Sequence, residues 1–184
     1  MALTPTDPIE LGSLAPNFAL HDTVSGDELH LNQIKGAKGS VIMFICNHCP
    51  FVLHINSTIA DLAKEYQEKG ISFIAISSND VLGYPQDGPE QMKALAKKEG
   101  FTFPYLYDET QDVAKAYGAQ CTPDIYLYNE GLELFYHGQL DDSRPGNDIA
   151  CDGKDLRNAM DALLKQKNAP ELQKPGIGCN IKWK

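Results

Sequence analysis

The 184-residue sequence lacks the features that mark several large classes of protein. No apolar run approaches the roughly 20 residues that span a bilayer, and residues 1–8 have neither the basic segment nor the long apolar segment of a signal peptide. Basic residues are few, with 16 Lys and Arg against 25 Asp and Glu, so the formal net charge is −9. That charge argues against nucleic acid or an anionic membrane as the main partner. We therefore expect a cytoplasmic protein that binds neither.

The cysteines do not suit a secreted fold held together by disulfides. There are five, an odd number, so at least one lacks an intramolecular disulfide partner. Structural zinc normally takes four protein ligands, and the sequence contains one Cys-x-x-Cys, Cys46 to Cys49, without a second. In a reducing compartment one such motif indicates redox chemistry, and we expect no metal and no bound organic cofactor.

The chain is organised around residues 41–52, where an apolar run ends in that motif. Residues 41–45 are all apolar, as expected of a strand covered on both faces. Apolar residues at helical spacing follow the motif, namely Val52, Ile55, Ile59, Leu62 and Tyr66. The two thiols therefore lie where a buried strand turns into a helix. Free N–H groups and the positive dipole end of that helix favour a thiolate and lower a cysteine pKa.

Hydrophobic periodicity and turn residues predict the other elements. The expected strands are residues 15–20, 41–45, 71–77, 103–107, 124–128 and 132–137, the last two as a hairpin, and the expected helices run from about 50 to near 70, from 89 to 100, from 112 to 117 and from 154 to about 167. Strand, helix and strand in succession give parallel pairing, and the hairpin is antiparallel. We expect one domain over residues 1–168, with a mixed sheet and helices on both faces, and a Pro- and Gly-containing tail over 169–184.

Several motifs are similar to those of the AhpC/TSA family, the peroxiredoxin-like proteins of the thioredoxin fold. Residues 11–18 are similar to its G-x-x-A-P-D-F opening, and residues 103–128 resemble its F-P-x-L-x-D … Y-G … P-x-x-Y/F-L stretch. Cys46 to Pro50 and Asp141 to Pro145 resemble a subgroup with Cys-x-x-Cys-Pro and Asp-Asp-Ser-Arg-Pro. The resemblance covers roughly residues 11–168. It implies an α/β thioredoxin-like fold with a central mixed sheet and a peroxiredoxin-type N-terminal extension.

The resemblance also implies a substrate groove. Pro123 would be the cis-proline that faces the Cys-x-x-Cys, with Thr122 beside it.

The sequence departs from the patterns of peroxiredoxins and thioredoxins at two places. Peroxiredoxins have Pro-x-x-x-Thr-x-x-Cys, whereas Cys46 stands at the Thr position here. Thioredoxins have Trp before the first cysteine and a buried Asp in the preceding strand, but Ile45 and the apolar strand supply neither. We therefore expect another group to handle proton transfer.

Cys46 and Cys49 are the candidate catalytic residues, because disulfide exchange needs two thiols one helical turn apart. Two assignments stay open. By resemblance to thioredoxins, Cys46 is the exposed nucleophile and Cys49 the buried resolving thiol, which we favour. By resemblance to peroxiredoxins, Cys49 is peroxidatic and Cys46 resolves it. His48 lies between them, where a partly cationic imidazole would stabilise the reduced form, or else it is a solvated turn residue.

Other residues have possible auxiliary roles. Cys121 is either a third redox thiol or a buried structural cysteine. Arg144 either stabilises a thiolate or pairs with a neighbouring carboxylate, Asp141 or Asp142.

The two remaining cysteines have no clear role in the sequence. We interpret Cys151 as incidental. Cys179, in the expected tail, we interpret as a passive cysteine rather than as a resolving thiol for a neighbouring molecule.

The sequence thus predicts a thiol–disulfide oxidoreductase. Its substrates would be protein dithiols and disulfides, or peroxide, with a thioredoxin-type or low-molecular-weight thiol as reductant. One alternative is a peroxiredoxin-like thiol peroxidase that uses Cys49 and forms a sulfenic acid there. A second alternative is a binding module whose redox pair only switches affinity for a protein partner. An enzyme turns over many equivalents of substrate, whereas a switch reacts with one.

Overall fold

The structure, a computed structural model, describes residues 3–184. The strands are β1 (Leu3–Pro5), β2 (Ala19–Asp22), β3 (Glu28–His30), β4 (Gly39–Phe44), β5 (Ile71–Ser77), β6 (Tyr105–Tyr107), β7 (Cys121–Thr122), β8 (Asp124–Asn129), β9 (Leu134–His137) and β10 (Ile177–Asn180). The helices are α1 (Leu31–Ile34), α2 (Pro50–Gln67), α3 (Pro89–Glu99), α4 (Asp112–Tyr117) and α5 (Lys154–Leu164), with a short 3₁₀ helix, η1 (Pro85–Asp87). Within residues 3–184 no helix is long and apolar enough to cross a membrane.

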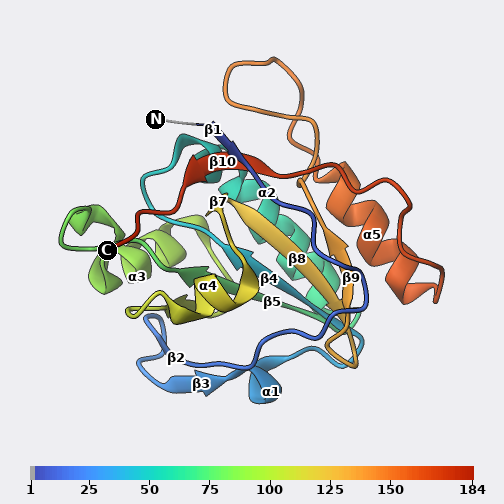
Figure 1. Cartoon of the computed structure of the whole chain (residues 1–184), viewed down its shortest axis with the longest axis horizontal. Coiled ribbons are helices and arrows are strands. Elements are labelled where there is room, and N and C mark those ends of the chain that lie inside the picture. Colours follow the sequence, from blue (N-terminus) through green and yellow to red (C-terminus); the bar gives the residue numbers. More distant parts are fainter. Residues whose placement is uncertain (1–2) are drawn as a thin grey trace.

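A mixed central sheet forms the middle of the molecule (Figure 1). Its strand order is β3-β2-β6-β5-β4-β8-β9. β5 runs parallel to both β4 and β6, whereas β8 pairs antiparallel with β4 and β9. All six residues of β4 are buried, which explains why this stretch is almost continuously apolar. The predicted mixed sheet, parallel crossover and terminal hairpin are confirmed.

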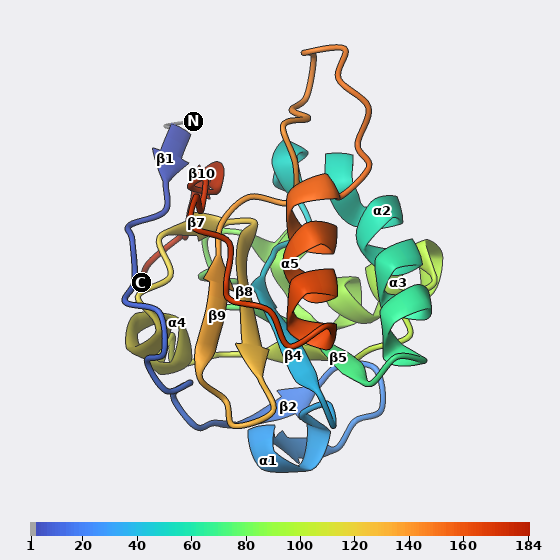
Figure 2. The same ribbon diagram turned by 90° about the vertical axis from the view of Figure 1, so that its right-hand side faces the viewer.

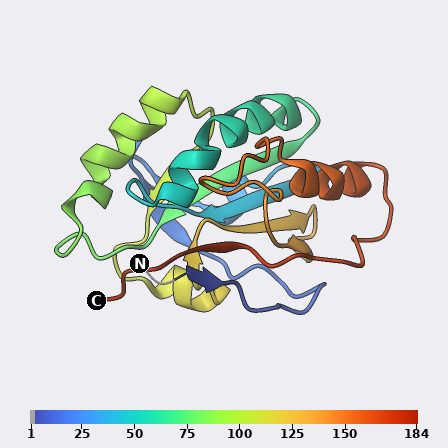
Figure 3. The same ribbon diagram turned by 90° about the horizontal axis from the view of Figure 1, so that it is seen from above.

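Helices cover both faces of this sheet, as predicted (Figures 2 and 3). On one face α2, α3 and α5 pack over Val41 and Met43. On the other, α4 and the N-terminal segment that includes Leu31 cover Ile42 and Phe44. Successive residues of β4 therefore point into two different apolar layers, as the pleat of a strand requires. This central position fixes the end of β4, and so the cysteines after it, firmly in the fold.

A second, smaller sheet, β1-β10-β7, lies outside the predicted elements (Figure 1). Cys179 of β10 pairs with Leu3 of β1 and with Thr122 of β7. The range 169–184, expected to be a tail, thus contributes a strand that lies against the segment before Pro123. Gly178 permits this close approach, because a Cβ there would overlap the Thr122 carbonyl group.

Some boundaries differ from the prediction. The strand expected over 15–20 begins at Ala19, because the residues before it run beside the hairpin instead: Leu14 bridges Glu133, and the Ala15 N–H donates to Leu132 O at 2.9 Å. α2 ends at Gln67 and α5 at Leu164, each a few residues earlier than expected. These shifts leave the strand order around the cysteines unchanged.

We expect Gly178→Ala to lower the free energy of unfolding by about 1–3 kcal/mol, the usual cost of overpacking a close contact. The added methyl would overlap the Thr122 carbonyl and lie 3.0 Å from the Pro123 nitrogen, so β10 must shift away from β7. Urea denaturation measures the effect. Gly131→Ala is the matched control, since its Cβ would meet only side-chain atoms, the nearer being Asn129 Oδ1 at 3.3 Å. Equal stability of the two variants would contradict this account of β10.

Candidate active site

The two cysteines flank the turn between β4 and α2. β4 ends at Phe44, and Cys49 is the extended N-cap residue of α2, with Pro50 in the first helical turn. Proline is favoured there because its missing N–H would have no helical acceptor. The turn is held from outside, since the Asn47 N–H donates to Asp87 Oδ1 at 2.8 Å. The fold thus places both sulfur atoms at the positive end of α2, as predicted.

Both thiols face Thr122. Cys46 Sγ lies 3.3 Å from Thr122 Oγ1, and Cys49 Sγ lies 3.1 Å from the Thr122 carbonyl oxygen. The two cysteine side chains also interact with each other, which shifts their pKa values in opposite directions. The Thr122–Pro123 peptide bond is cis, as the family resemblance implies. The structure therefore brings the two cysteines next to the Thr122–Pro123 segment, which lies more than 70 residues away in the sequence.

The expectation that Cys46 is exposed is wrong. Cys46 is 1% exposed and Cys49 is fully buried, so neither sulfur is open to a large substrate in this conformation. The reason is the close packing of the Cys46 side chain against Thr122 and Cys49. A small oxidant needs less movement than a protein disulfide to reach the pair.

The two thiols differ in acidity. The hydrogen bond with Cys46 lowers the pKa of Cys49 to about 4, helped by Cys179 and the Val52 N–H group and opposed by burial. The same bond, burial and the nearby Asp87 carboxylate raise the pKa of Cys46. One contact acts against a Cys49 thiolate, because the Thr122 carbonyl oxygen attracts a thiol proton and repels a negative sulfur. The interaction thus lowers the pKa of Cys49 and raises that of Cys46.

Asp87 is the buried acid that the sequence did not identify. It is fully buried, and it binds the Asn47 N–H, His48 Nδ1 at 2.7 Å and Asn79 Nδ2 at 2.8 Å. Its position in a Gly-, Pro- and Asp-containing loop gave no sign of burial. His48 is neither free nor merely solvated, because its ring pairs with Asp87 and stacks on Tyr84 with centroids 5.3 Å apart.

Three side chains of the site, one of them that of Cys46, are of types that bind metal ions. Within residues 3–184, Cys46, His48 and Asp87 each offer a ligand atom, and these atoms lie within 4.8 Å of one another. A thiolate, an imidazole and a carboxylate suit zinc with one open position. The His48–Asp87 contact at 2.7 Å is, however, a hydrogen bond that a shared ion would have to replace. The absence of a metal therefore stays a prediction.

A third sulfur atom lies beside the pair. Cys179 Sγ is 3.1 Å from Cys49 Sγ, and Cys179 is 3% exposed. The sequence interpretation of a passive cysteine did not anticipate this contact, which depends on the pairing of β10 with β7. Cys121 is also buried, but its sulfur lies 3.6 Å from the Pro123 carbonyl oxygen, and burial raises its pKa. Cys151 is partly exposed in the loop before α5.

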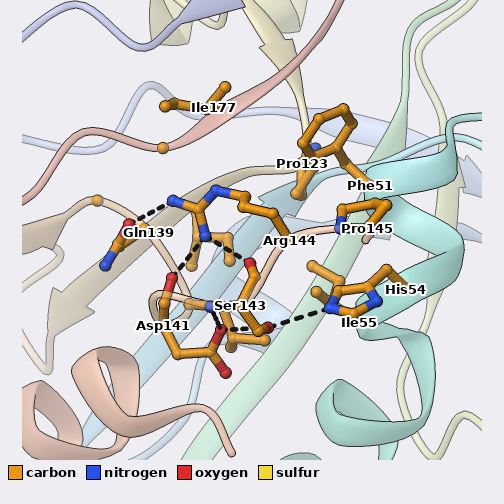
Figure 4. Close-up of a pocket in the computed structure, with 14 residues that line it drawn as sticks. Phe51, His54, Ile55, Pro123, Gln139, Asp141, Ser143, Arg144, Pro145 and Ile177 are labelled. Atoms are coloured by element: carbon orange, nitrogen blue, oxygen red, sulfur yellow. Dashed lines mark hydrogen bonds between the residues drawn. The ribbon is translucent and has the colours of Figure 1, made fainter. Parts of the chain in front are cut away.

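Arg144 lines a pocket next to Pro123 (Figure 4). Its guanidinium donates to the backbone carbonyl oxygens of Asp141 at 2.7 Å and Ser143 at 2.6 Å, and to the Gln139 side chain. Neither interaction expected for Arg144, with a thiolate or with a carboxylate, is present within residues 3–184. The guanidinium instead braces the loop that forms one wall of the pocket.

The rest of that pocket is mainly apolar. Phe51 and Ile55 come from α2, and Ile177 comes from β10 (Figure 4). His54 Nε2 lies 3.1 Å from Ser143 Oγ and ties α2 to the Arg144 loop. The pocket therefore adjoins Pro123, with mainly apolar side chains and the Arg144 guanidinium in its walls.

Comparison with known proteins gives a consistent picture. The AhpC/TSA family model matches residues 11–136. The thiol-disulfide oxidoreductase ResA of Halalkalibacterium halodurans is 30% identical over 67% of this chain and 65% of its own length. Peroxiredoxin Bcp of Escherichia coli is 28% identical over 61% of this chain and 66% of its own length. The chain thus spans just under two thirds of these relatives.

Among solved structures, an uncharacterized conserved protein from Geobacillus kaustophilus matches with a TM-score of 0.98 and 52% identity, covering 100% of this chain and 97% of that one. This match shows the same fold over nearly the full length of both chains.

Proposed function

Because this chain belongs to the AhpC/TSA family and has a thioredoxin-like α/β fold, we propose that it is a thiol–disulfide oxidoreductase whose redox-active disulfide forms between Cys46 and Cys49. One observation carries the proposal: at the N-terminus of α2 the two thiols both contact Thr122, whose peptide bond to Pro123 is cis. The similarity to ResA and Bcp supports the same class of chemistry.

In the proposed cycle Cys46 passes its proton to the neighbouring Cys49 thiolate and attacks one sulfur of a substrate disulfide, and the other substrate sulfur leaves as a thiolate that takes up this proton. Cys49 then attacks Cys46 Sγ, which releases the second substrate sulfur and forms the Cys46–Cys49 disulfide. The Thr122 hydroxyl, 3.3 Å from Cys46 Sγ, can donate to the attacking thiolate. A thioredoxin-type or low-molecular-weight thiol supplies the two electrons that restore the dithiol.

Two features of the site have roles in this cycle. The pair of the buried Asp87 and the partly exposed His48 lies beside the cysteines, and it supports proton transfer in place of the aspartate that is missing from β4. The pocket with Pro123, Phe51 and Arg144 offers a docking surface for the substrate chain. Because Cys46 is buried, we expect the turn at residues 46–49 to open when a protein disulfide docks.

The number of turnovers tests this proposal. We expect the reduced protein, with excess dithiothreitol and oxidised insulin as a probe, to reduce many equivalents of disulfide per chain. Cys151→Ala is a matched control, since Cys151 lies on the loop before α5 and should leave the rate unchanged. Consumption of a single equivalent would contradict an enzyme and favour a redox-switched binding module.

A thiol peroxidase is the second candidate, favoured by the low pKa of Cys49 and the burial of both sulfurs. The Cys49 thiolate would attack one peroxide oxygen, the O–O bond would break, and the departing oxygen would leave as water after protonation. Cys46 would then condense with the sulfenic acid, releasing a second water. Loss of two thiols from the reduced protein, faster with hydrogen peroxide than for an ordinary thiol, would support this activity. Equally fast oxidation of Cys49 in Cys46→Ser would then overturn Cys46 as first nucleophile.

We expect His48→Pro to lower the reduction potential of the pair by about 30 mV, equivalent to roughly a tenfold change in the equilibrium. A ring nitrogen of His48 lies within 4.8 Å of Cys46 Sγ, and positive charge on an imidazole beside a thiolate stabilises the reduced form. Equilibration with glutathione buffers measures the potential. His48→Gln serves as a control that keeps a hydrogen-bonding side chain, and an unchanged potential in both variants would assign His48 a structural role only.

A further inference from the structure

We propose that Cys179 is a third redox residue of this site, which forms an intramolecular disulfide with Cys49. The inference rests on the proposed redox role of Cys49. The two sulfur atoms lie 3.1 Å apart, and both are buried. Since a disulfide bond is about 2.05 Å long, the sulfurs need to approach by only about 1 Å.

The position of Cys179 is built into the fold. β10 is held on one side by β1 and on the other by β7, with Cys179 directly opposite Thr122. The Thr122 carbonyl is itself 3.1 Å from Cys49 Sγ. Gly178, which admits no side chain, brings β10 close enough for this contact. The short sulfur–sulfur distance thus follows from strand pairing on both sides of Cys179.

The contacts of Cys121 differ from those of Cys179, although the two cysteines lie close together. Both cysteines are buried and lie on paired strands of the small sheet. The Cys121 sulfur, however, lies against the Pro123 carbonyl at 3.6 Å, whereas the Cys179 sulfur faces Cys49. Both residues are therefore buried near the site. Cys179 differs from Cys121 because its sulfur contacts the sulfur of Cys49.

The reaction is an isomerisation of the active-site disulfide. The Cys179 thiolate attacks Cys49 Sγ, the Cys46–Cys49 bond breaks, and Cys46 leaves as a thiolate that takes up the proton lost by Cys179. No electrons enter or leave. If Cys49 is instead a sulfenic acid, the Cys179 thiol condenses with it and water is released. Either route leaves Cys46 as a free thiol while the oxidised state is held at the buried Cys49–Cys179 pair.

The electrostatics favour this order of events. Burial, together with the hydrogen bond and charge of Cys49, raises the pKa of Cys179 to about 12 in the reduced protein. Oxidation of Cys49 removes its negative charge, so deprotonation of Cys179 becomes easier once the disulfide or sulfenic acid has formed. Cys179 is thus unreactive in the reduced site and becomes available after Cys49 is oxidised.

Disulfide mapping of the folded, full-length protein tests the proposal. Cys46→Ser is oxidised with diamide, which accepts the two electrons, then alkylated and digested with trypsin. No Lys or Arg separates Cys46 from Cys49, whereas Cys179 lies on a different peptide. In most of the Cys46→Ser chains we expect a disulfide cross-link between the peptide with Cys49 and the peptide with Cys179. This cross-link should be lost in Cys46→Ser/Cys179→Ser. The matched double variant Cys46→Ser/Cys121→Ala should retain it.

Wild-type protein gives an independent readout that does not depend on the folding of a variant. With limiting diamide, the Cys46–Cys49 disulfide stays within one peptide, and the isomerised form joins two, so their masses differ. We expect both forms. Absence of the cross-link in wild type and in Cys46→Ser, with Cys46–Cys49 still formed, would overturn the role of Cys179 alone. Absence of any Cys49 disulfide would overturn the proposed function as well.

Discussion

Cys46→Ser and Cys49→Ser should each lower the turnover of a protein disulfide by at least about a thousandfold, because residues that act as a unit lose most of their activity together. A serine hydroxyl does not ionise near neutral pH and forms no bond to sulfur that a second thiol could resolve. The insulin assay described above measures the loss. For the same reason the double variant should be no less active than either single variant.

The two single variants also separate the alternative assignments. If Cys46 is the exchange nucleophile, Cys49→Ser should accumulate a stable mixed disulfide with the substrate at Cys46, visible by intact mass, and Cys46→Ser should accumulate none. The opposite pattern would assign the first attack to Cys49. Full activity in either variant would contradict the dithiol cycle itself.

Asp87→Ala should lower the free energy of unfolding by about 3 kcal/mol, a typical cost of leaving buried donors without an acceptor. Asp87 is fully buried and accepts hydrogen bonds from the Asn47 N–H and the Asn79 side chain, in addition to its contact with His48. Urea denaturation checks the prediction. Asp61→Ala, on the exposed face of α2, is the control and should change stability little.

Asp87→Asn should change the acidity of the site in a defined direction. The Asp87 carboxylate raises the pKa of Cys46, after the larger effects of the Cys49 hydrogen bond and burial. Removing that negative charge therefore lowers the pKa of Cys46, and its pH profile of alkylation should move to lower pH. The profile is measured in a Cys49→Ser background, where Cys46 is the only thiol of the motif. A shift to higher pH would contradict the effect assigned to the Asp87 charge on the pKa of Cys46.

Much of the fold could be predicted because its main elements carry their own periodic signal. β4 is buried on both faces, and α2 has a continuous apolar stripe, so each can be identified without knowledge of its neighbours. β7 and β10 have two and four residues, and they become strands only through pairing with each other and with β1. Such short segments have no periodicity that could distinguish them from loop or tail.

The site likewise contains residues that the local sequence identifies and residues that only tertiary contacts identify. Cys46 and Cys49 are adjacent in a motif, and the resemblance to a family identified the cis Pro123. Asp87 and Cys179 reach the motif from sequence separations of 40 and 130 residues, through contacts with Asn47 and Cys49. Nothing local in the sequence marks a loop aspartate as buried or a cysteine near Pro and Gly as part of a sheet. Asp87 and Cys179 can be identified as parts of the site only from the tertiary structure.

The small sheet also has a consequence for the order of folding. Pairing of Leu3 with Cys179 joins the two ends of almost the entire chain, and each doubling of the loop to be closed adds about 0.6 kcal/mol of entropic cost. Contacts of such high sequence separation form late, after the local strand–helix–strand units. We therefore expect the turn with Cys46 and Cys49 to form during folding before β10, which carries Cys179, is in place. During that interval the motif is exposed to thiols and oxidants that, in the finished fold, reach the two buried sulfurs only after the turn opens.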